Sequence, residues 1–210
     1  MEFDIEKIIS NLANNYYPLF VSERHLQVSF IIEANKCYQN YSFIPEYVFN
    51  DHGKTLHIDL MISDGNEYIA VEFKYIVAGG KINVPGDKNY KLRNQSAVVN
   101  RRHQCVMDIC RLEKYVSSNK IKCTKGYFVL ITNMSAFWKG SKSESTSSEF
   151  DIKDKSILHK GVHSPIGETK FAKEKEKIEL KNDYKIKYKD YKKIDGKSGL
   201  FKYLLVEVEK

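Results

Sequence analysis

The chain has 210 residues, which suits one domain, and 42% of them are hydrophobic, which allows a single sizeable core. Its formal net charge of +7 fits a polyanionic partner such as nucleic acid, although a solvated lysine-rich surface explains the same count. The absence of a long apolar run, of a signal-peptide pattern and of CxxC pairs argues against a membrane span, secretion and a zinc site. We therefore expect a cytoplasmic protein with reduced thiols and no membrane partner.

The N-terminal part of the sequence predicts two helices. Residues 2–16 form the first, because apolar residues recur on one face, and Pro18 ends it. Ser22 is a good N-cap for the second, which runs to about Tyr38. The apolar stripes are Ile5, Ile8, Ile9 and Leu12 in the first helix and Leu26, Phe30, Ala34 and Cys37 in the second.

Two strands follow the helices. Residues 43–49 predict a short edge strand, because Pro45 cannot donate a hydrogen bond to a sheet ladder. Residues 56–63 alternate in hydropathy, which predicts a strand with one apolar face and with Asp59 on the opposite face. The residues expected on the apolar face are Leu56, Ile58, Leu60 and Ile62.

A hairpin leads to the strand that matters most for function. The turn 64–66 reads Asp-Gly-Asn, and residues 68–77 predict the returning strand. Glu72 and Lys74 share one face of that strand with Ala70. The opposite face carries Ile69, Val71, Phe73 and Tyr75.

The remaining sequence predicts one further helix and more strands. Residues 78–94 are rich in Gly, Lys and Asn and predict a mobile loop, and residues 95–116 predict a helix. Residues 127–132 predict a buried strand, and residues 139–149 form a Ser/Lys-rich, flexible insertion. The Lys/Tyr-rich tail predicts strands at 177–181, 184–188 and 200–208. We expect it to pack on the core, so that residues 1–210 form a single domain.

Three of these residues suggest a chemistry. Hydrolysis of a phosphodiester with Mg²⁺ needs hard oxygen ligands and a group that positions the attacking water. Asp59 and Glu72 supply two carboxylates from adjacent strands of one hairpin. Lys74 points to the same face as Glu72, and its ammonium can orient the nucleophile and offset negative charge in the transition state.

The [DE]-x-Lys pattern alone specifies little, because it recurs in this lysine-rich chain. Only Glu72-Phe73-Lys74 lies in a strongly apolar strand beside a hairpin strand with a second acid. The alternative is a solvated face with a cross-strand ion pair worth roughly 0.2–1 kcal/mol. The other matches begin at Asp151, Glu168, Glu179, Asp183, Asp190 and Asp195.

On these residues the chain resembles the PD-(D/E)XK, restriction endonuclease-like nuclease superfamily, and within it a group of largely uncharacterised bacterial proteins. The resemblance implies an α/β fold with a restriction endonuclease-like core, in which helices flank a mixed central β-sheet. It implies that Asp59 and Glu72 bind Mg²⁺, which Mn²⁺ can replace, that Lys74 assists hydrolysis, and that Glu23 contributes from the second helix. The segments that carry it are 22–27, 70–75, 107–115, 128–133 with Trp138, and 200–206.

Two positions depart from that family pattern. Ile58 stands where the superfamily name records a proline, and Met134 stands where an acid would be expected after the strand at 127–132.

Glu23 has an alternative interpretation as an acid favoured by the helix dipole, while Gln27, one turn later, can hold a water or a ligand by hydrogen bond.

The polar face of the helix at 95–116 also has two interpretations. In one, Arg101 binds a phosphate of a nucleic acid, with Gln104 beside it. In the other, the face is a surface network in which Asp108 and Arg111 pair at i,i+3. We favour the second for Asp108 and Arg111 and leave Arg101 open.

The leading hypothesis is a metal-dependent nuclease that acts on DNA in preference to RNA, in host defence or mobile-element biology by analogy. The alternative is a non-cutting module on the same fold that binds nucleic acid or a protein partner. A third is a structural protein with an ion-paired hairpin. Double-strand cutting needs two active sites, so a homodimer, or a protein partner in a larger system, fits the leading hypothesis.

Overall fold

The computed structural model describes residues 2–15, 20–51, 54–84, 87–92, 97–118, 121–141, 145–196 and 198–210. Its centre is a six-stranded sheet in which β3 and β6 run parallel and all other neighbours run antiparallel. The expected mixed α/β architecture is therefore confirmed. The strands, in sheet order, are β1 (Ser42–Asp51), β2 (Lys54–Ser63), β3 (Tyr68–Ile76), β6 (Cys123–Thr132), β12 (Leu200–Glu209) and β11 (Tyr188–Lys193).

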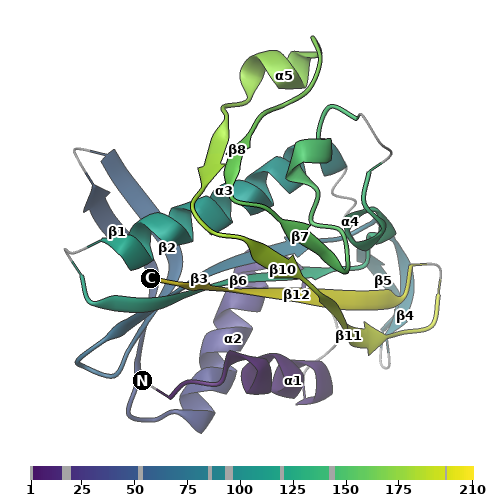
Figure 1. The fold of residues 1–210 in the computed structure, drawn as a ribbon. Helices are drawn as coiled ribbons and strands as arrows, with labels where there is room; N and C mark the ends of the chain where they lie inside the picture. The colour runs from purple at the N-terminus through teal and green to yellow at the C-terminus, as the bar shows by residue number, and fades with distance from the viewer. Residues whose placement is uncertain are drawn as a thin grey trace.

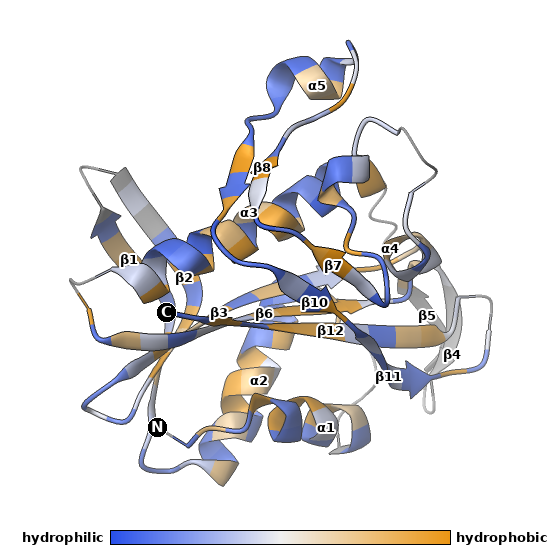
Figure 2. Ribbon diagram, in the orientation of Figure 1, coloured by the Kyte–Doolittle hydropathy of each residue, from blue (hydrophilic) through white to orange (hydrophobic). Residues whose placement is uncertain are grey.

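Helices cover both faces of this sheet (Figure 1). On one face lie α1 (Ile5–Asn15) and α2 (Glu23–Cys37), and their apolar side chains join those of the sheet in a cluster that we call the α1/α2-side cluster. On the other face lies α3 (Val98–Ser117), which joins the α3-side cluster. The hydrophobic colour runs along the central strands β6 and β12, where both clusters meet the sheet (Figure 2).

The predicted helices form, with the buried apolar stripes and the N-cap that the sequence predicted. The apolar stripe of α1 is almost completely buried, and the Ser22 hydroxyl caps α2 by accepting a hydrogen bond from the His25 N–H at 3.1 Å. The stripe of α3 is buried as well, including the side chain of Arg102. Pro18 and Gln95, at the expected ends of two helices, lie outside the described residues.

The strand predicted at 56–63 forms, but its apolar residues do not all face the same side of the sheet. Leu60 and Ile62 belong to the α1/α2-side cluster, whereas Ile58 belongs to the α3-side cluster. The change coincides with Glu46 in the paired strand β1, whose φ of 50° departs from extended backbone. Such a residue reverses the regular alternation of side chains in a strand. The outer half of the β1–β2 hairpin therefore packs on the α3 side.

The segment at 78–94 is not only a loop. Backbone pairing forms a two-stranded sheet from β4 (Gly80–Val84) and β5 (Asp87–Leu92). Hydrogen bonds between two segments that are close in sequence satisfy backbone N–H and C=O groups even where the side chains have a low strand propensity. The Gly-, Lys- and Asn-rich composition therefore wrongly predicted a loop here.

The C-terminal half folds back over α3. The strand predicted at 200–208 is β12, which lies between β6 and β11 in the central sheet, so this part of the tail packs on the core as expected. Between β6 and β11 the chain forms short elements on the same side of the sheet as α3 (Figure 1). They are α4 (Ser135–Lys139), a 3-10 turn (Ser148–Phe150), β7 (Ser156–Leu158), β8 (Gly161–His163), α5 (Lys170–Glu174), β9 (Ile178–Leu180) and β10 (Tyr184–Ile186).

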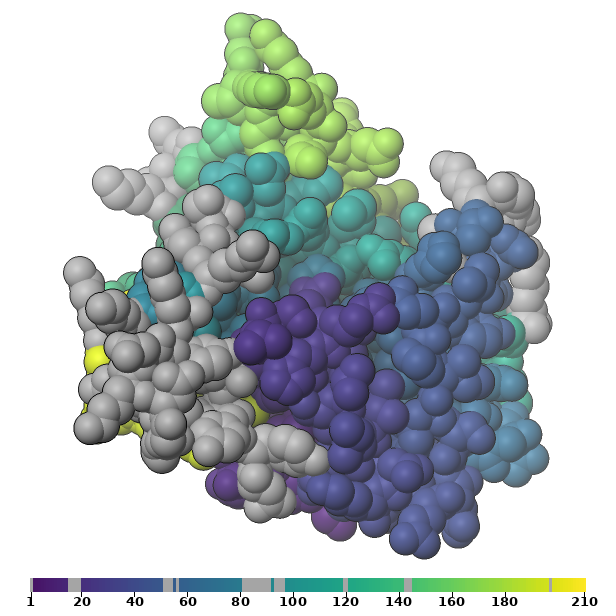
Figure 3. Space-filling view, turned by 180° about the vertical axis from the view of Figure 1, so that it is seen from behind, coloured from purple at the N-terminus to yellow at the C-terminus, as the bar shows by residue number. Residues whose placement is uncertain are grey.

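Two buried charged residues of α3 hold these elements in place. The Arg102 guanidinium lies 3.0 Å from Asp151 Oδ1 and donates to the Ala136 carbonyl at 2.6 Å. The Glu113 carboxylate accepts hydrogen bonds from the backbone of Lys181 and from the Tyr184 hydroxyl at 2.8 Å. Seen from the opposite side, α3 lies between the projecting α5 segment and the surface formed by α2 and the β1–β2 hairpin (Figure 3).

Within the described residues, no helix is both long enough and apolar enough to cross a membrane. The four cysteines are all free thiols, and Cys105, Cys110 and Cys123 are buried, as the sequence predicted. Of the Ser/Lys-rich insertion at 139–149, residues 142–144 lie outside the described residues, and Ser147 is fully buried.

Candidate active site

The candidate site lies where β2 and β3 separate. The backbone pairing between these strands runs from Ser63 and Tyr68 to Leu60 and Val71. At the next position the side chain of Asp59, and not a backbone carbonyl, bonds to β3. Its Oδ2 accepts a hydrogen bond from the Phe73 N–H at 2.7 Å. This hydrogen bond fixes the Asp59 carboxylate beside β3.

The face of β3 that was predicted to carry Glu72 and Lys74 does so. Phe73 and Tyr75 point into the α1/α2-side cluster, and Ala70 points into the α3-side cluster. The Glu72 carboxylate points away from the α1/α2-side cluster with 1% of its surface exposed. A buried carboxylate needs partners, because an unpaired charge in the interior is costly.

Helix α3 supplies those partners through Asp108 and Arg111. Arg111 Nη1 donates to Glu72 Oε1 at 2.9 Å and to the His57 carbonyl at 3.2 Å, while its Nη2 donates to Asp108 Oδ1 at 2.6 Å. Lys74 Nζ lies 2.9 Å from the other carboxylate oxygen of Asp108, which is 2% exposed. The i,i+3 pair of Asp108 and Arg111 is confirmed, but it is buried against β3 and is not a surface network.

Helix α2 contributes Glu23 from its first turn. Its Oε2 accepts a hydrogen bond from the Tyr75 N–H at 3.2 Å, and its Oε1 lies 3.5 Å from Lys74 Nζ. Lys74 Nζ also donates to the Phe73 carbonyl at 2.9 Å. The ammonium thus lies within 3.5 Å of three oxygens, which come from α2, α3 and β3. Glu23 and Lys74, 51 positions apart in sequence, therefore meet.

Negative charge exceeds positive charge in this cluster. It holds four carboxylates, of Glu23, Asp59, Glu72 and Asp108, against two cations, Lys74 and Arg111. We call these six residues the acidic cluster. If all four carboxylates are ionised, two negative charges have no counter-ion in the cluster.

The pKa values of the buried acids respond to that excess. Burial raises the pKa of Glu72 well above its ordinary value, the charges of Asp108 and Asp59 add to the rise, and Arg111 opposes it only in part. Burial raises the pKa of Asp108 against the attraction of Lys74. Burial likewise raises the pKa of Glu23.

The cations respond in the opposite sense. Burial alone would lower the pKa of Lys74, but the charges of Asp108 and Glu23 outweigh burial and hold this pKa above its usual range. The Arg111 pKa is raised by Glu72 and Asp108 despite the burial of the guanidinium. Both side chains are therefore fixed cations over the whole physiological range.

The donor set fits a divalent cation in charge and in chemistry. Two uncompensated negative charges match one divalent ion, and carboxylate oxygens are the ligands that Mg²⁺ and Mn²⁺ take from proteins. Among the residues that the structure describes, however, no group of three or more His, Cys, Asp or Glu side chains converges as a metal site. The residues that would hold the ion are Asp59 and Glu72, of which Glu72 already has one oxygen, Oε1, paired with Arg111.

The remaining predicted residues lie further from this centre. Gln27 is buried one turn after Glu23 in α2. Arg101 Nη1 donates to Gln104 Oε1 at 2.9 Å, so these two residues of α3 form a pair of their own, and no hydrogen bond or ion pair of either with the acidic cluster is found among the described residues. The sequence interpretation missed the role of Asp108 and Arg111, although their i,i+3 spacing was the available signal.

Comparisons with protein-family models, with curated proteins and with solved structures found no match to this chain. The family resemblance described under "Sequence analysis" thus stays a prediction. A function has to be argued from the acidic cluster and its surroundings.

Proposed function

We propose that the protein is a metal-dependent nuclease of the PD-(D/E)XK type, which hydrolyses phosphodiester bonds in nucleic acid, DNA in preference to RNA. The observation that carries the proposal is the acidic cluster, in which four carboxylates, two of them buried, face two cations where β2 and β3 separate. A partly buried excess of negative charge costs stability, so its presence favours a functional over a structural role.

Each residue has a role in this proposal. Asp59 and Glu72 hold Mg²⁺ or Mn²⁺, and the bound ion supplies Lewis-acid activation of the phosphate and of the attacking water. Lys74 positions the nucleophile and offsets charge on the phosphate oxygens. Glu23 anchors the ammonium of Lys74, to which its Oε1 lies 3.5 Å away. The net charge of +7 supports a polyanionic substrate.

A cleavage panel tests the proposal. Single- and double-stranded DNA and RNA are incubated with the full chain in Mg²⁺, Mn²⁺ or EDTA, together with Asp59→Asn and Lys74→Met variants. The matched control is Asp190→Asn, because Asp190-Tyr-Lys192 has the same [DE]-x-Lys pattern on strand β11, where Asp190 is exposed. We expect metal-dependent cleavage by the parent and the control, and a loss of at least 100-fold in both cluster variants, as for removal of a catalytic group.

A binding measurement makes the test independent of turnover. Titration calorimetry with Mn²⁺ should show one site in the parent and in Asp190→Asn, and none in Asp59→Asn. Cleavage that persists undiminished in Asp59→Asn and Lys74→Met would remove both residues from the mechanism. No cleavage and no Mn²⁺ binding by the parent would refute the proposal as a whole.

One observation favours a second function. Arg111 and Lys74 already pair with one carboxylate oxygen of Glu72 and both of Asp108 at 2.6–2.9 Å. A non-cutting module on the same fold would keep this ion-paired cluster and bind nucleic acid or a protein partner. Binding of nucleic acid that weakens steeply with salt, without cleavage in any divalent metal, would support this function.

A further inference from the structure

A groove lies beside the acidic cluster, between α3 and the segment that leads into β9. It is a cavity of about 390 Å³, with Met107 and Ile178 among its apolar walls and with Arg111, Lys114 and Lys177 around it. Two hydrogen bonds pin its sides together, from the imidazole of His103 to the Glu176 carbonyl and from the Cys110 thiol to the Glu179 carbonyl. The groove is thus preformed and does not depend on a loop closing.

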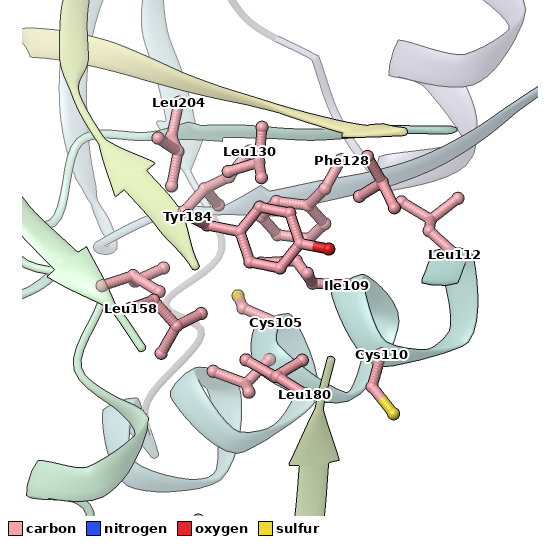
Figure 4. Packing of buried hydrophobic residues seen from close by; sticks show 14 of the residues in the cluster. Cys105, Ile109, Cys110, Leu112, Phe128, Leu130, Leu158, Leu180, Tyr184 and Leu204 are labelled. Atoms are coloured by element: carbon pink, nitrogen blue, oxygen red, sulfur yellow. The ribbon is translucent and has the colours of Figure 1, made fainter. Parts of the chain in front are cut away.

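Core packing beneath the groove fixes β9 against α3. Leu180 of β9 packs against Cys105 and Ile109 of α3 within the α3-side cluster, whereas the thiol of Cys110 points away from that cluster (Figure 4). Ile178 and Leu180 of β9 both belong to this cluster, and the exposed residue between them, Glu179, lines the groove as well. Met107, which is 38% exposed, presents an apolar surface there.

The charge around the groove is positive. Four cationic side chains line it against two carboxylates, and one of the cations, Lys181, pairs with the Glu179 carboxylate at 2.7 Å. Lys114 and Lys177 are exposed, and neither forms an ion pair with any residue that the structure describes. Arg111 pairs with the acidic cluster, so Lys114 and Lys177 remain beside one further carboxylate, that of Glu176. An apolar wall with two ammonium groups at its rim that form no ion pair is complementary to an anionic ligand that has a flat apolar part.

Arg111 joins the groove to the acidic cluster. Its guanidinium contacts Glu72 at 2.9 Å and also lines the groove. A ligand in the groove therefore lies one side chain away from Glu72, the proposed metal ligand. Lys114 follows Arg111 by one turn of α3, so the cations form a row that leads away from the cluster along the helix.

We propose that this groove binds a single-stranded segment of the nucleic-acid substrate, next to the phosphodiester that is cut. A base or sugar lies on Met107, and backbone phosphates lie on Lys114 and Lys177. Single strands bind to proteins in this way, on an apolar platform within a positively charged channel. A cavity of about 390 Å³ is of the size that encloses one small ligand, so it takes a nucleotide of an unpaired strand and not a stacked duplex.

The inference rests on the proposed function for the identity of the adjoining site, and it adds a substrate class, a nucleic acid with an unpaired strand. Binding is measured by fluorescence anisotropy in EDTA, so that no cleavage occurs, with a labelled 12-nucleotide single-stranded DNA and the 12-base-pair duplex of the same sequence. The variants are Lys114→Ala, Lys177→Ala and the double variant. The control is Lys185→Ala, which removes an exposed lysine of β10 outside the groove.

We expect the double variant to bind the single strand on the order of tenfold more weakly, and the salt dependence of log Kd to fall by about 1.4, at about 0.7 per phosphate contact. Lys185→Ala should bind as the parent does, and the duplex should bind the parent at least tenfold more weakly than the single strand. A strand that carries 5-iodouracil should cross-link to the peptide that contains Met107. Unfolding temperatures confirm that each variant is folded.

The results separate the two proposals. If the parent cuts nucleic acid but the double variant binds and cuts like Lys185→Ala, the groove inference is overturned and the nuclease function stands. If no metal supports cleavage but the double variant loses single-strand binding and the Met107 cross-link forms, the groove inference stands without the nuclease. Equal binding of duplex and single strand by the parent would also overturn the inference.

Discussion

Replacing Glu72 with Gln should abolish activity and at the same time stabilise the protein at neutral pH. Gln keeps the size of the side chain and can still accept a hydrogen bond from Arg111, which donates to Glu72 at 2.9 Å. The variant removes one of four carboxylates and leaves three against two cations. Arg111 also keeps its contact of 2.6 Å with Asp108, so no cation becomes unpaired.

The size of the stability gain depends on electrostatic attractions and repulsions of Glu72 that largely cancel. At an effective dielectric constant of about 20, the Glu72–Arg111 attraction is roughly 4 kcal/mol. Lys74 adds to this attraction, whereas the charges of Asp108 and Asp59 oppose it. The cost of burying the charge then decides, since Glu72 is 1% exposed. We expect a gain of about 1 kcal/mol in the free energy of unfolding, within the range of stabilising substitutions at functional sites. In a chain of this size that gain raises Tm by about 2–4 °C.

The gain should depend on pH in a defined direction. The pKa of Glu72 is raised in the folded chain above its ordinary value of 4.5, so the folded state binds the proton more tightly than the unfolded state. The parent is then most stable relative to the variant below pH 4.5 and loses stability as pH rises through the folded pKa. Protonated Glu and Gln are both neutral, so the difference in Tm should vanish near pH 4 and grow toward pH 8.

The assay is urea unfolding of the parent, Glu72→Gln and the exposed-acid control Asp190→Asn at pH 5 and pH 8, with Mg²⁺ removed. Asp190→Asn should change the free energy of unfolding by less than about 0.5 kcal/mol at either pH. If Glu72→Gln is less stable than the parent at pH 8, the ion pair with Arg111 outweighs burial. The acidic cluster would then be a structural ion-pair network, and the charge argument for a metal site would fail.

Three further predictions concern the same framework. Lys74→Met should lower Tm more at pH 8 than at pH 5 in a differential scanning experiment, because the buried acids that face Lys74 can take up protons only at the lower pH. Glu113→Ala should lower the free energy of unfolding by about 3 kcal/mol in urea, because donors on the chain around Lys181 lose a buried charged acceptor; Glu113→Gln should recover part of it. Gly126→Ala should cost about 1–3 kcal/mol by the same measurement, because the new Cβ would lie 3.2 Å from Leu112; an unchanged Tm would mean that α3 can move away from β6.

The part of the site that is local in sequence could be predicted from it. The two-residue period of β3 places Glu72 and Lys74 on one face, and the turn at 64–66 sets the hairpin that brings Asp59 beside them. Glu23 was predicted from its place at the start of α2 beside the apolar stripe. Its contact with Lys74 depends only on that helix packing with the expected face inward.

The part of the site that depends on tertiary packing could not be predicted. Asp108 and Arg111 read as a surface pair, because i,i+3 spacing says nothing about what a helix face packs against. The rotation of α3 is set by the residues it buries, such as Cys105 and Ile109, and by the close approach that Gly126 permits. Only then does its polar face meet Glu72 and become buried.

The errors in the fold have the same origin. Ile58 was assigned to the wrong face because alternation was assumed to continue through a strand whose partner has a positive φ at Glu46. The hairpin of β4 and β5 was missed because backbone pairing leaves little trace in composition. The restriction endonuclease-like core remains a prediction, whereas the mixed sheet between helices is established.

Helix α3 links the two proposals physically. One face of it gives Asp108 and Arg111 to the acidic cluster, the next turn gives Lys114 to the groove, and Glu113 holds the chain around Lys181 beside the groove. If Arg111 leaves Glu72, its guanidinium keeps the contact with Asp108 at 2.6 Å, whereas the buried carboxylate of Glu72 needs another cation. On the two proposals, a divalent metal would supply that cation and a phosphate in the groove would be a further anion for Arg111, so the binding of each would favour the binding of the other. The ion pair that closes the site without metal is, on this reasoning, the contact that substrate and metal together would open.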